Sequence, residues 1–238
     1  MASFSTLTFV VTFLLVGWLT LLCTTPPNKP APSRRWKHDR VEIWVTSTGL
    51  ITRWILIVAA VLYHAALALV FPSLTDKGSS ANVICPHPRN LNPTLFSWNA
   101  HTALCFLLVI CIAAPVRFTS FSHLGKNFTF VLAKPDHLVT TGIYSYVQHP
   151  SYTGQFLVFV AHLSLVLRWD AGPGCLVPEA VRARLDGWGF ILCMLFTAWV
   201  LRKLAQRVQD EEAMLRQMFG EEWERWHRST KRFIPGVF

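Results

Sequence analysis

The chain has 238 residues, of which 52% are apolar and only 15% are charged. Soluble domains usually carry about 25% charged residues, so this composition argues against an ordinary soluble protein and indicates a chain that lies largely in lipid. The net charge of +9 would suit a nucleic-acid partner, but the cations flank apolar runs, where membrane topology and lipid headgroups account for them. We therefore expect a lipid bilayer and no nucleic acid as partner.

Five apolar runs are candidate membrane helices, because a spanning helix needs roughly 20 mostly apolar residues. The first run, residues 7–23, resembles a signal peptide in length, but no Lys or Arg precedes it and no small-residue cleavage site follows it. We therefore expect an uncleaved span there. The other candidate runs are residues 54–71, 95–116, 153–167 and 187–201, the fourth being short unless residues 149–152 extend it.

The Lys and Arg residues between these runs predict the orientation of the chain. They are frequent after the first and third runs and at the start of the C-terminal tail, and sparse after the second run. The positive-inside rule places the cation-rich segments in the cytosol, and five spans give that alternation with the N-terminus on the lumenal side. The residues that carry this assignment are Lys29, Arg34, Arg35, Lys37 and Arg40 in the first loop, Lys77 and Arg89 in the second, Arg117, Lys126 and Lys134 after the third run, and Arg202, Lys203 and Arg207 in the tail.

The six cysteines form no C-x-x-C pair and no zinc-binding spacing. Cys85 and Cys175 lie in the two loops that this topology places in the lumen, so they could pair there, and the sequence leaves that open. His137 and His149 are too far apart for a standard helical ligand pair and have no evident third partner. We therefore predict no metal site.

The stretch KPDHLVTTGIYSYVQHPSYTGQF, residues 134–156, gathers polar side chains directly before an apolar run. Gly142 can adopt the positive φ of a turn, and Pro150 is tolerated in the first turn of the helix that follows. The three tyrosines of the stretch could be simple interfacial anchors, with rings in lipid and hydroxyls in water. Two histidines and two threonines in the same short loop favour a binding site over that interpretation.

A second polar cluster occupies residues 201–228 and has helical spacing. Arg207 and Glu211 are four residues apart and lie on one side of this predicted helix, with Glu212 adjacent to them. When this cluster is taken alone, an amphipathic helix with routine ion pairs is the favoured explanation.

Together the two clusters resemble the isoprenylcysteine carboxyl methyltransferase family. The first cluster contains HLVTTGIYSYVQHPSYTGQF, which is similar to the family signature H-x-L-V-T-x-G-x-Y-x-x-x-R-H-P-x-Y-x-G. The second contains RVQDEEAMLRQMFGEEWERW, which is similar to the family's Arg, paired Glu and Phe-Gly-Glu-Glu-aromatic segment. The resemblance covers residues 125–235. It implies an enzyme of the endoplasmic reticulum membrane, with its active site facing the cytosol, that uses S-adenosyl-L-methionine to methylate the carboxylate of a prenylated cysteine.

The resemblance implies a helical membrane fold, and the apolar runs give five spans, fewer than the family pattern. We expect an all-α integral membrane protein with about five transmembrane helices and a cytosolic C-terminal helical segment that completes the cofactor site. Residues 1–116 would hold the first three spans, and residues 117–238 would form the methyltransferase core.

Roles for individual residues follow from the resemblance by position. Arg207 and Glu211 would be catalytic, with Arg207 close to the substrate carboxylate, and Gln148 would lie on the substrate side of the site. The residues implied to hold the cofactor are His137, Leu138, Val139, Gly142, Tyr144, His149, Pro150, Tyr152 and Glu212.

The chemistry needs few groups. A carboxylate is already ionised at neutral pH, so its methylation requires no general base. A cation such as Arg207 that makes a two-pronged contact with the carboxylate would position it. This chain departs from the family at Gln148, where the signature has Arg directly before His149-Pro150, so the acceptor could differ.

Three alternatives therefore stay open. The acceptor could be a small lipophilic acid in place of a prenylated cysteine. The chain could instead be an N- or O-methyltransferase of a lipid or small metabolite, which would need His149, His137 or a glutamate as a base. It could also be an inactive membrane scaffold.

Overall fold

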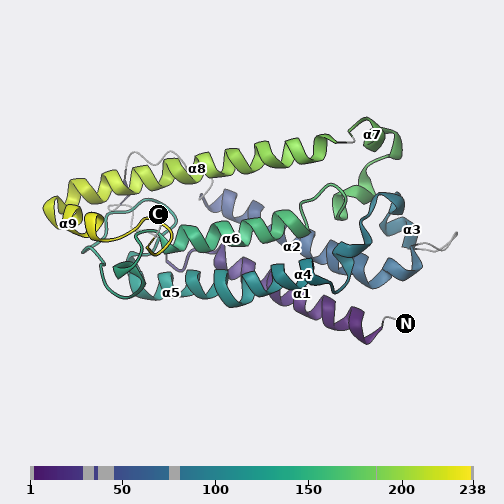
Figure 1. The fold of residues 1–238 in the computed structure, drawn as a ribbon, viewed down its shortest axis with the longest axis horizontal. Helices are drawn as coiled ribbons and strands as arrows, with labels where there is room; N and C mark the ends of the chain where they lie inside the picture. The colour runs from purple at the N-terminus through teal and green to yellow at the C-terminus, as the bar shows by residue number, and fades with distance from the viewer. Residues whose placement is uncertain (1–2, 29–34, 37–45, 75–80, 186, 237–238) are drawn as a thin grey trace. The chain divides into compact units, whose positions relative to one another are not determined.

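The structure is a computed structural model that describes residues 3–28, 35–36, 46–74, 81–185 and 187–236 (Figure 1). Within these residues the regular structure is helical, and β-type pairing is limited to isolated bridges. The expected all-α fold is therefore confirmed. The α-helices are α1 (Phe4–Cys23), α2 (Ser47–Val70), α3 (Ala81–Ile84), α4 (Ala100–Leu107), α5 (Ala114–Leu124), α6 (Pro150–Leu165), α7 (Glu179–Arg184), α8 (Trp188–Phe219) and α9 (Glu221–Ser229).

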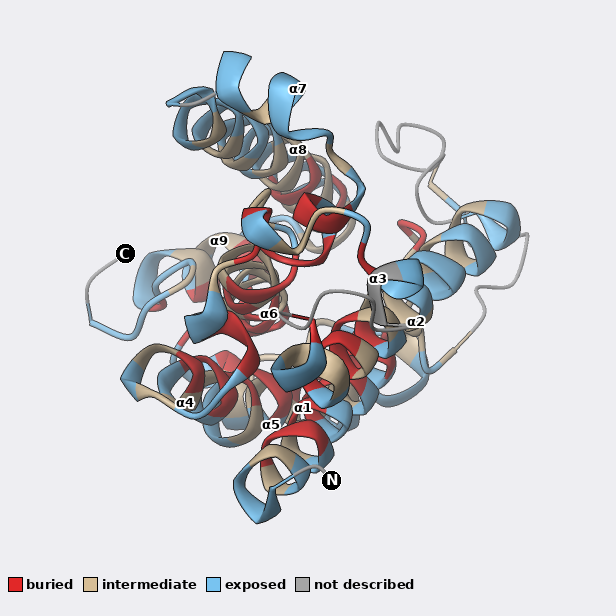
Figure 2. Cartoon of the chain, turned by 90° about the vertical axis from the view of Figure 1, so that its right-hand side faces the viewer, coloured by how far each residue is buried: buried red, intermediate tan, exposed pale blue. Residues whose placement is uncertain are grey.

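Four helical segments of the described chain are long and apolar enough to cross a membrane: Phe4–Cys23, Ser47–Ser73, Ala100–Asn127 and Trp188–Phe219. They contain the first and second predicted runs and most of the third and fifth, so the chain is a multi-pass membrane protein. The first half of α8 exposes large apolar side chains such as Phe190 and Leu195, as a lipid-facing helix does (Figure 2).

The fourth predicted run forms α6, which has 16 residues. At 1.5 Å per residue this helix is about 24 Å long, shorter than the hydrocarbon core of about 30 Å. Pro150 begins the helix, so residues 149–152 extend the run by less than one turn. The number of five spans therefore stays a prediction.

Two predicted boundaries moved. The third helix begins at Ala100, because the Asn99 side chain accepts hydrogen bonds from the backbone N–H groups of His101 and Thr102 at 2.9 and 3.1 Å and so caps the helix. The fifth run and the polar tail helix form one continuous helix, α8, of 32 residues. Five of the cations that predicted the topology lie outside the described residues: Lys29, Arg34, Lys37, Arg40 and Lys77.

The chain divides into two compact units, which are described separately. Unit 1 comprises Met1–Leu21, Trp54–Cys111 and Val158–Thr197, and unit 2 comprises Leu22–Arg53, Ile112–Leu157 and Ala198–Phe238. The functional division between residues 116 and 117 stays a prediction.

Unit 1 has an aromatic core around a buried histidine. The ring of His64 lies between those of Phe13 and Phe96, with centroid distances of 4.7 and 4.5 Å, and its Nε2 donates to the Leu95 carbonyl at 2.9 Å. Buried polar groups in a membrane protein need such partners. Cys85 and Cys175 form a disulfide in this unit, which settles the pairing that the sequence left open.

Unit 2 packs the second half of α8 and the start of α9 onto the segment between α5 and α6. Its buried apolar residues include a cluster of Leu132, Tyr144, Met214, Leu215, Trp223 and Trp226. Both polar clusters of the sequence therefore lie in one unit.

Candidate active site

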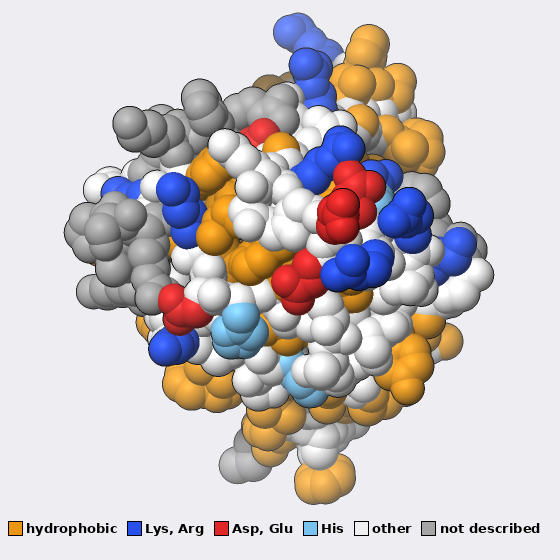
Figure 3. All heavy atoms as spheres, turned by 90° about the vertical axis from the view of Figure 1, so that its left-hand side faces the viewer, with side chains coloured by type: hydrophobic (Ala, Val, Ile, Leu, Met, Phe, Trp, Pro, Cys, Tyr) orange, Lys and Arg blue, Asp and Glu red, His pale blue; other side chains and the backbone are white. Residues whose placement is uncertain are grey.

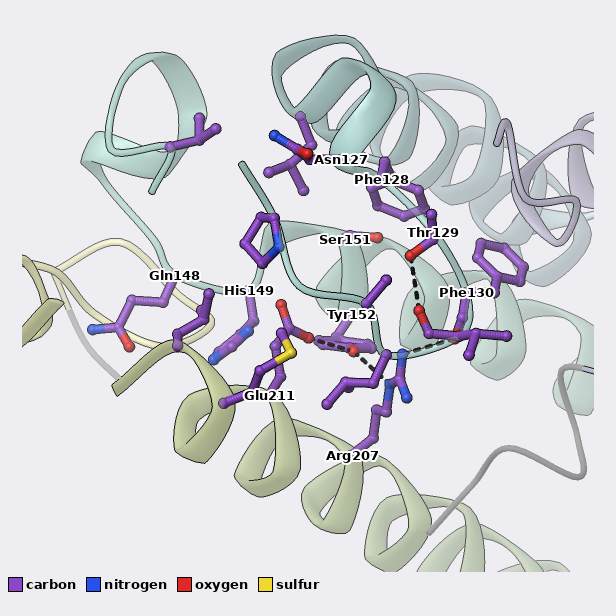
Figure 4. A pocket seen from close by; sticks show the side chains of 18 of the residues that line it. Asn127, Phe128, Thr129, Phe130, Gln148, His149, Ser151, Tyr152, Arg207 and Glu211 are labelled. Atoms are coloured by element: carbon purple, nitrogen blue, oxygen red, sulfur yellow. Dashed lines mark hydrogen bonds between the residues drawn. The ribbon is translucent and has the colours of Figure 1, made fainter. Parts of the chain in front are cut away.

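Unit 2 contains a cavity of about 380 Å³ (Figure 4). Its walls come from the segment between α5 and α6, from the first turns of α6 and from the second half of α8. Most of the predicted site residues line it: His137, Leu138, Val139, Tyr144, Gln148, His149, Tyr152, Arg207 and Glu211. Gly142, Pro150 and Glu212 are not among the lining residues.

The hydroxyl of Tyr152 connects Arg207 and Glu211, two of the charged residues of α8 that line the cavity. It donates to Glu211 Oε2 at 2.6 Å and accepts from Arg207 Nε at 3.2 Å. The Nη2 of Arg207 also donates to the Phe130 carbonyl at 2.7 Å, and the Arg207 side chain is buried. The guanidinium and the carboxylate are thus held on one wall of the cavity (Figure 4).

Glu212 points elsewhere, because neighbouring residues on an α-helix project about 100° apart. Its carboxylate accepts from His149 Nε2 at 3.2 Å and from Arg232 Nε and Nη2, each at 2.9 Å. His149 lines the cavity, so Glu212 is linked to the site by its hydrogen bond to this histidine.

Gln148 is buried, and its amide is hydrogen-bonded to the C-terminal part of the chain. The Nε2 lies 3.0 Å from the carbonyl oxygens of His227 and Thr230, and the Oε1 accepts from His227 Nδ1 at 2.8 Å. In Figure 4 this amide points away from Arg207. The predicted substrate contact of Gln148 stays a prediction, and the geometry gives its amide a structural task.

Gly142 adopts a φ of +62°, as expected for the turn before Tyr144. A Cβ at this position would lie 2.0 Å from Nε2 of His123. The His123 ring is itself fixed by a 2.8 Å hydrogen bond between its Nδ1 and the Thr119 carbonyl. Gly142 therefore contributes to the site by letting the loop pack closely on α5.

Gly154, the last glycine of the signature stretch, allows a close approach between helices α6 and α5. A Cβ there would lie 2.9 Å from the carbonyl oxygen of Ala113 and 2.8 Å from Cγ of Arg117. The glycine therefore leaves room for the Arg117 side chain beside the cavity.

Arg117 and Arg53 are lining residues that the sequence did not identify as such. Arg117 is buried, donates to the Cys23 carbonyl through Nε at 3.1 Å, and lies over the ring of Phe121 at 4.8 Å. Arg53 donates to the Thr24 carbonyl at 2.6 Å. Arg117 had a signal in the sequence, an arginine directly after an apolar run, but the topology rule explained it without a site.

The charge of the cavity wall is predominantly positive. Among the described residues, four cationic side chains and one carboxylate line it: Arg53, Arg117, Lys203, Arg207 and Glu211. Such a wall favours a ligand that carries an anionic group.

Tyr144 is a neutral group of this site. Burial, together with the nearby charge of Glu211, raises the pKa of its phenol well above the usual range. Its backbone carbonyl accepts from the Trp226 indole at 2.8 Å, which joins α9 to the cavity loop. Across the residues that the structure describes, no group of three His, Cys, Asp or Glu side chains could hold a metal ion.

Fold and cavity together define a helical multi-pass membrane protein with a ligand-sized, cation-rich site. Comparison with known proteins narrows this class. The model of the isoprenylcysteine carboxyl methyltransferase family matches residues 105–183, which extend from α4 to α7. The predicted resemblance to this family is thus confirmed, and the matched residues include the first of the two motifs.

Individual relatives agree with the family match. A protein-S-isoprenylcysteine O-methyltransferase of Schizosaccharomyces pombe is 30% identical over 152 residues, which are 62% of this chain and 54% of that protein. One from Dictyostelium discoideum is 29% identical over 126 residues, 51% of this chain and 44% of that protein. A probable protein-S-isoprenylcysteine O-methyltransferase of Oryza sativa subsp. indica is 24% identical over 205 residues, 84% of this chain and 85% of that protein.

The family model and the first two relatives each match only part of this chain. The chain spans about half the length of the yeast and Dictyostelium relatives. The family match ends at residue 183, before α8 begins at Trp188. The roles of Arg207, Glu211 and Glu212 therefore enter below as proposals.

Proposed function

We propose that this chain is a membrane methyltransferase that transfers the methyl group of S-adenosyl-L-methionine to the carboxylate of a prenylated cysteine or a similar lipophilic acid. The observation that carries the proposal is the cavity itself. It joins the loop of the first motif, including His137 and His149, to Arg207 and Glu211 of the second motif. The names of the aligned relatives support the same reaction.

The residues present fit such a cofactor. A volume of about 380 Å³ lies within the range of about 300–1,000 Å³ that is usual for small-ligand sites. The Glu211 carboxylate suits the cationic end of the cofactor, and the rings of Tyr144 and Trp226 suit its planar base. His137, Leu138, Val139 and His149 would complete its binding site. When bound, S-adenosyl-L-methionine supplies the activated methyl group.

The chain's own residues would orient the acceptor. Arg207 donates hydrogen bonds to the Tyr152 hydroxyl and to the Phe130 carbonyl, so its guanidinium is held in place before a ligand binds. A preorganised cation holds a carboxylate in line for displacement at little cost in reorganisation. Since the acceptor is already ionised, no side chain has to remove a proton.

Gln148 is compatible with a carboxylate acceptor. Its amide is hydrogen-bonded to His227 and Thr230, next to α9. The family signature has an arginine at this position, so this chain lacks one positive charge there. Arg53, Arg117 and Arg207 keep the cavity cationic without it.

We further infer that the protein lies in the endoplasmic reticulum membrane with the cavity open to the cytosol. Support comes from the Cys85–Cys175 disulfide, because disulfides form in oxidising compartments such as the lumen, where the predicted alternation of five spans puts both loops. A prenyl chain would then reach the site from the bilayer, and the soluble cofactor from the cytosol.

The test is a methyl-transfer assay with purified protein, labelled S-adenosyl-L-methionine and two acceptors, a prenylcysteine analogue and a small prenylated acid. We expect transfer to at least one of them and a loss of about 100-fold or more in Arg207→Ala, since a charge-assisted two-pronged contact is removed. Arg202→Ala is the matched control, because Arg202 is exposed on the same helix. Equal turnover by Arg207→Ala and Arg202→Ala would refute the role of Arg207.

A further inference from the structure

Residues 230–233, close to the end of the described chain, lie along the cavity loop and are called the C-terminal strap here. The backbone N–H of Gln148 donates to the Lys231 carbonyl and that of His149 to the Arg232 carbonyl, both at 2.8 Å. Val147 and Lys231 form an isolated parallel bridge. The strap is therefore fixed in register beside the residues that begin α6.

This register brings Arg232 onto Glu212 of α8. Two nitrogens of the guanidinium meet the two carboxylate oxygens, Nε to Oε1 and Nη2 to Oε2, each at 2.9 Å. Such two-pronged contacts fix the orientation of the carboxylate plane as well as its position. The Glu212 side chain is only 12% exposed, so solvent screens the pair less than an ordinary surface pair.

Glu212 in turn holds His149. Its Oε1 accepts from His149 Nε2 at 3.2 Å, and the histidine side chain is 2% exposed. The His149 ring also lies beside the rings of Tyr152 and Phe233, with centroid distances of 5.7 and 5.9 Å. The orientation of the His149 ring in the cavity wall thus depends on the Glu212 carboxylate outside the cavity. The position of that carboxylate depends in turn on Arg232.

A second ion pair in unit 2 shows what an ordinary surface contact would look like. Arg216 Nη2 lies 2.8 Å from Glu224 Oε1, with side chains 67% and 36% exposed, and neither residue lines the cavity. Figure 3 shows acidic and basic side chains interspersed on the face that carries α9, where such pairs are common. The Arg232–Glu212 pair differs because its carboxylate is also bonded to a histidine of the site.

We propose that Arg232 is a positioning residue for cofactor binding: it holds Glu212, and Glu212 holds His149 in the cavity wall. Under this assignment the neighbouring glutamates have different tasks, since Glu211 faces the ligand and Glu212 supports the wall. The inference rests on the proposed function, because it takes the ligand beside His149 to be S-adenosyl-L-methionine.

Arg232→Ala should then weaken the binding of S-adenosylhomocysteine and raise the KM for the methyl donor by about tenfold, the effect of losing one or two charge-assisted contacts. The kcat and the KM for the acceptor should stay within about twofold, because Arg207 and Tyr152 are held by bonds to each other, to Glu211 and to the Phe130 carbonyl. Arg232→Lys should restore only part of the affinity, since an ammonium cannot make the two-pronged contact.

The experiment measures the Kd of S-adenosylhomocysteine calorimetrically for wild type, Arg232→Ala, Arg232→Lys and Glu212→Gln, with Arg216→Ala as the matched control. The unfolding temperature without ligand shows whether each variant is folded, and Glu212→Gln tests the same link if Arg232→Ala does not fold. A Kd for Arg232→Ala or Glu212→Gln equal to that of Arg216→Ala would overturn the inference. A wild-type protein that binds no S-adenosylhomocysteine would overturn the proposed function instead.

Discussion

At the scale of single residues, the Tyr152 hydroxyl is the group that organises the site. It donates to Glu211 and accepts from Arg207, which are both charged side chains of α8. The sequence assigned Tyr152 only to cofactor binding, by resemblance. In the structure it also bonds to both Arg207 and Glu211 and so fixes the separation of these two charges.

Tyr152→Phe should therefore lower kcat/KM by about 10–100-fold, since hydrogen bonds to charged groups contribute about 1.5–3 kcal/mol each. The steady-state kinetics of methyl transfer measure this. Tyr146→Phe is the matched control, because Tyr146 lies in the same loop but is 67% exposed. A Tyr152→Phe enzyme as active as Tyr146→Phe would show that the hydroxyl has no part in holding Arg207 and Glu211.

At the scale of elements, the attachment of α9 to the loop before α6 determines the shape of the site. Gln148 and the Trp226 indole supply side-chain bonds between these segments, and Trp226 lines the cavity. Because the Gln148 amide is buried, removing it leaves backbone carbonyls and His227 without their partner. Unpaired buried groups of this kind cost about 1–3 kcal/mol each.

Gln148→Ala should accordingly lower the unfolding temperature of the detergent-solubilised protein by several degrees, while the preference between a prenylcysteine analogue and a small prenylated acid stays the same. Differential scanning fluorimetry and a competition assay with both acceptors measure the two effects. A changed acceptor preference with unchanged stability would return Gln148 to the substrate side of the site.

At the scale of the whole molecule, the disulfide constrains the membrane topology. Cys85 precedes the apolar segment Ala100–Asn127 and Cys175 follows α6. Bonded cysteines lie on the same side of a membrane, so an even number of crossings must separate them. If Ala100–Asn127 crosses the bilayer, α6 crosses it as well, although it is short.

Glycosylation mapping tests this topology. An Asn-x-Thr acceptor sequence introduced beside Arg89 should be glycosylated in microsomes, because that loop would be lumenal. The native sequence Asn127-Phe128-Thr129 should stay unmodified, because it would face the cytosol. Glycosylation of Asn127 would contradict the orientation and the cytosolic cavity.

Local features of this fold could be predicted from the sequence. Apolar run length located four of the helices, and Gly142 and Pro150 marked the turn and the helix start that build the cavity loop. What the sequence could not show were contacts between distant segments. Arg117 reaches the Cys23 carbonyl, 94 residues away, and Arg232 reaches Glu212. No periodicity encodes such pairs, because they depend on how the helices pack.

The most direct test of the central claim is the chemical nature of the methylated product. After turnover with a prenylcysteine analogue and methyl-labelled S-adenosyl-L-methionine, we expect a methyl ester, whose label is released as volatile methanol in alkali. We expect Arg207→Ala to yield almost none of it. Label that survives alkali, as on a methylated amine or ether, or the absence of any transfer by the wild-type protein, would contradict carboxylate methylation in this cavity.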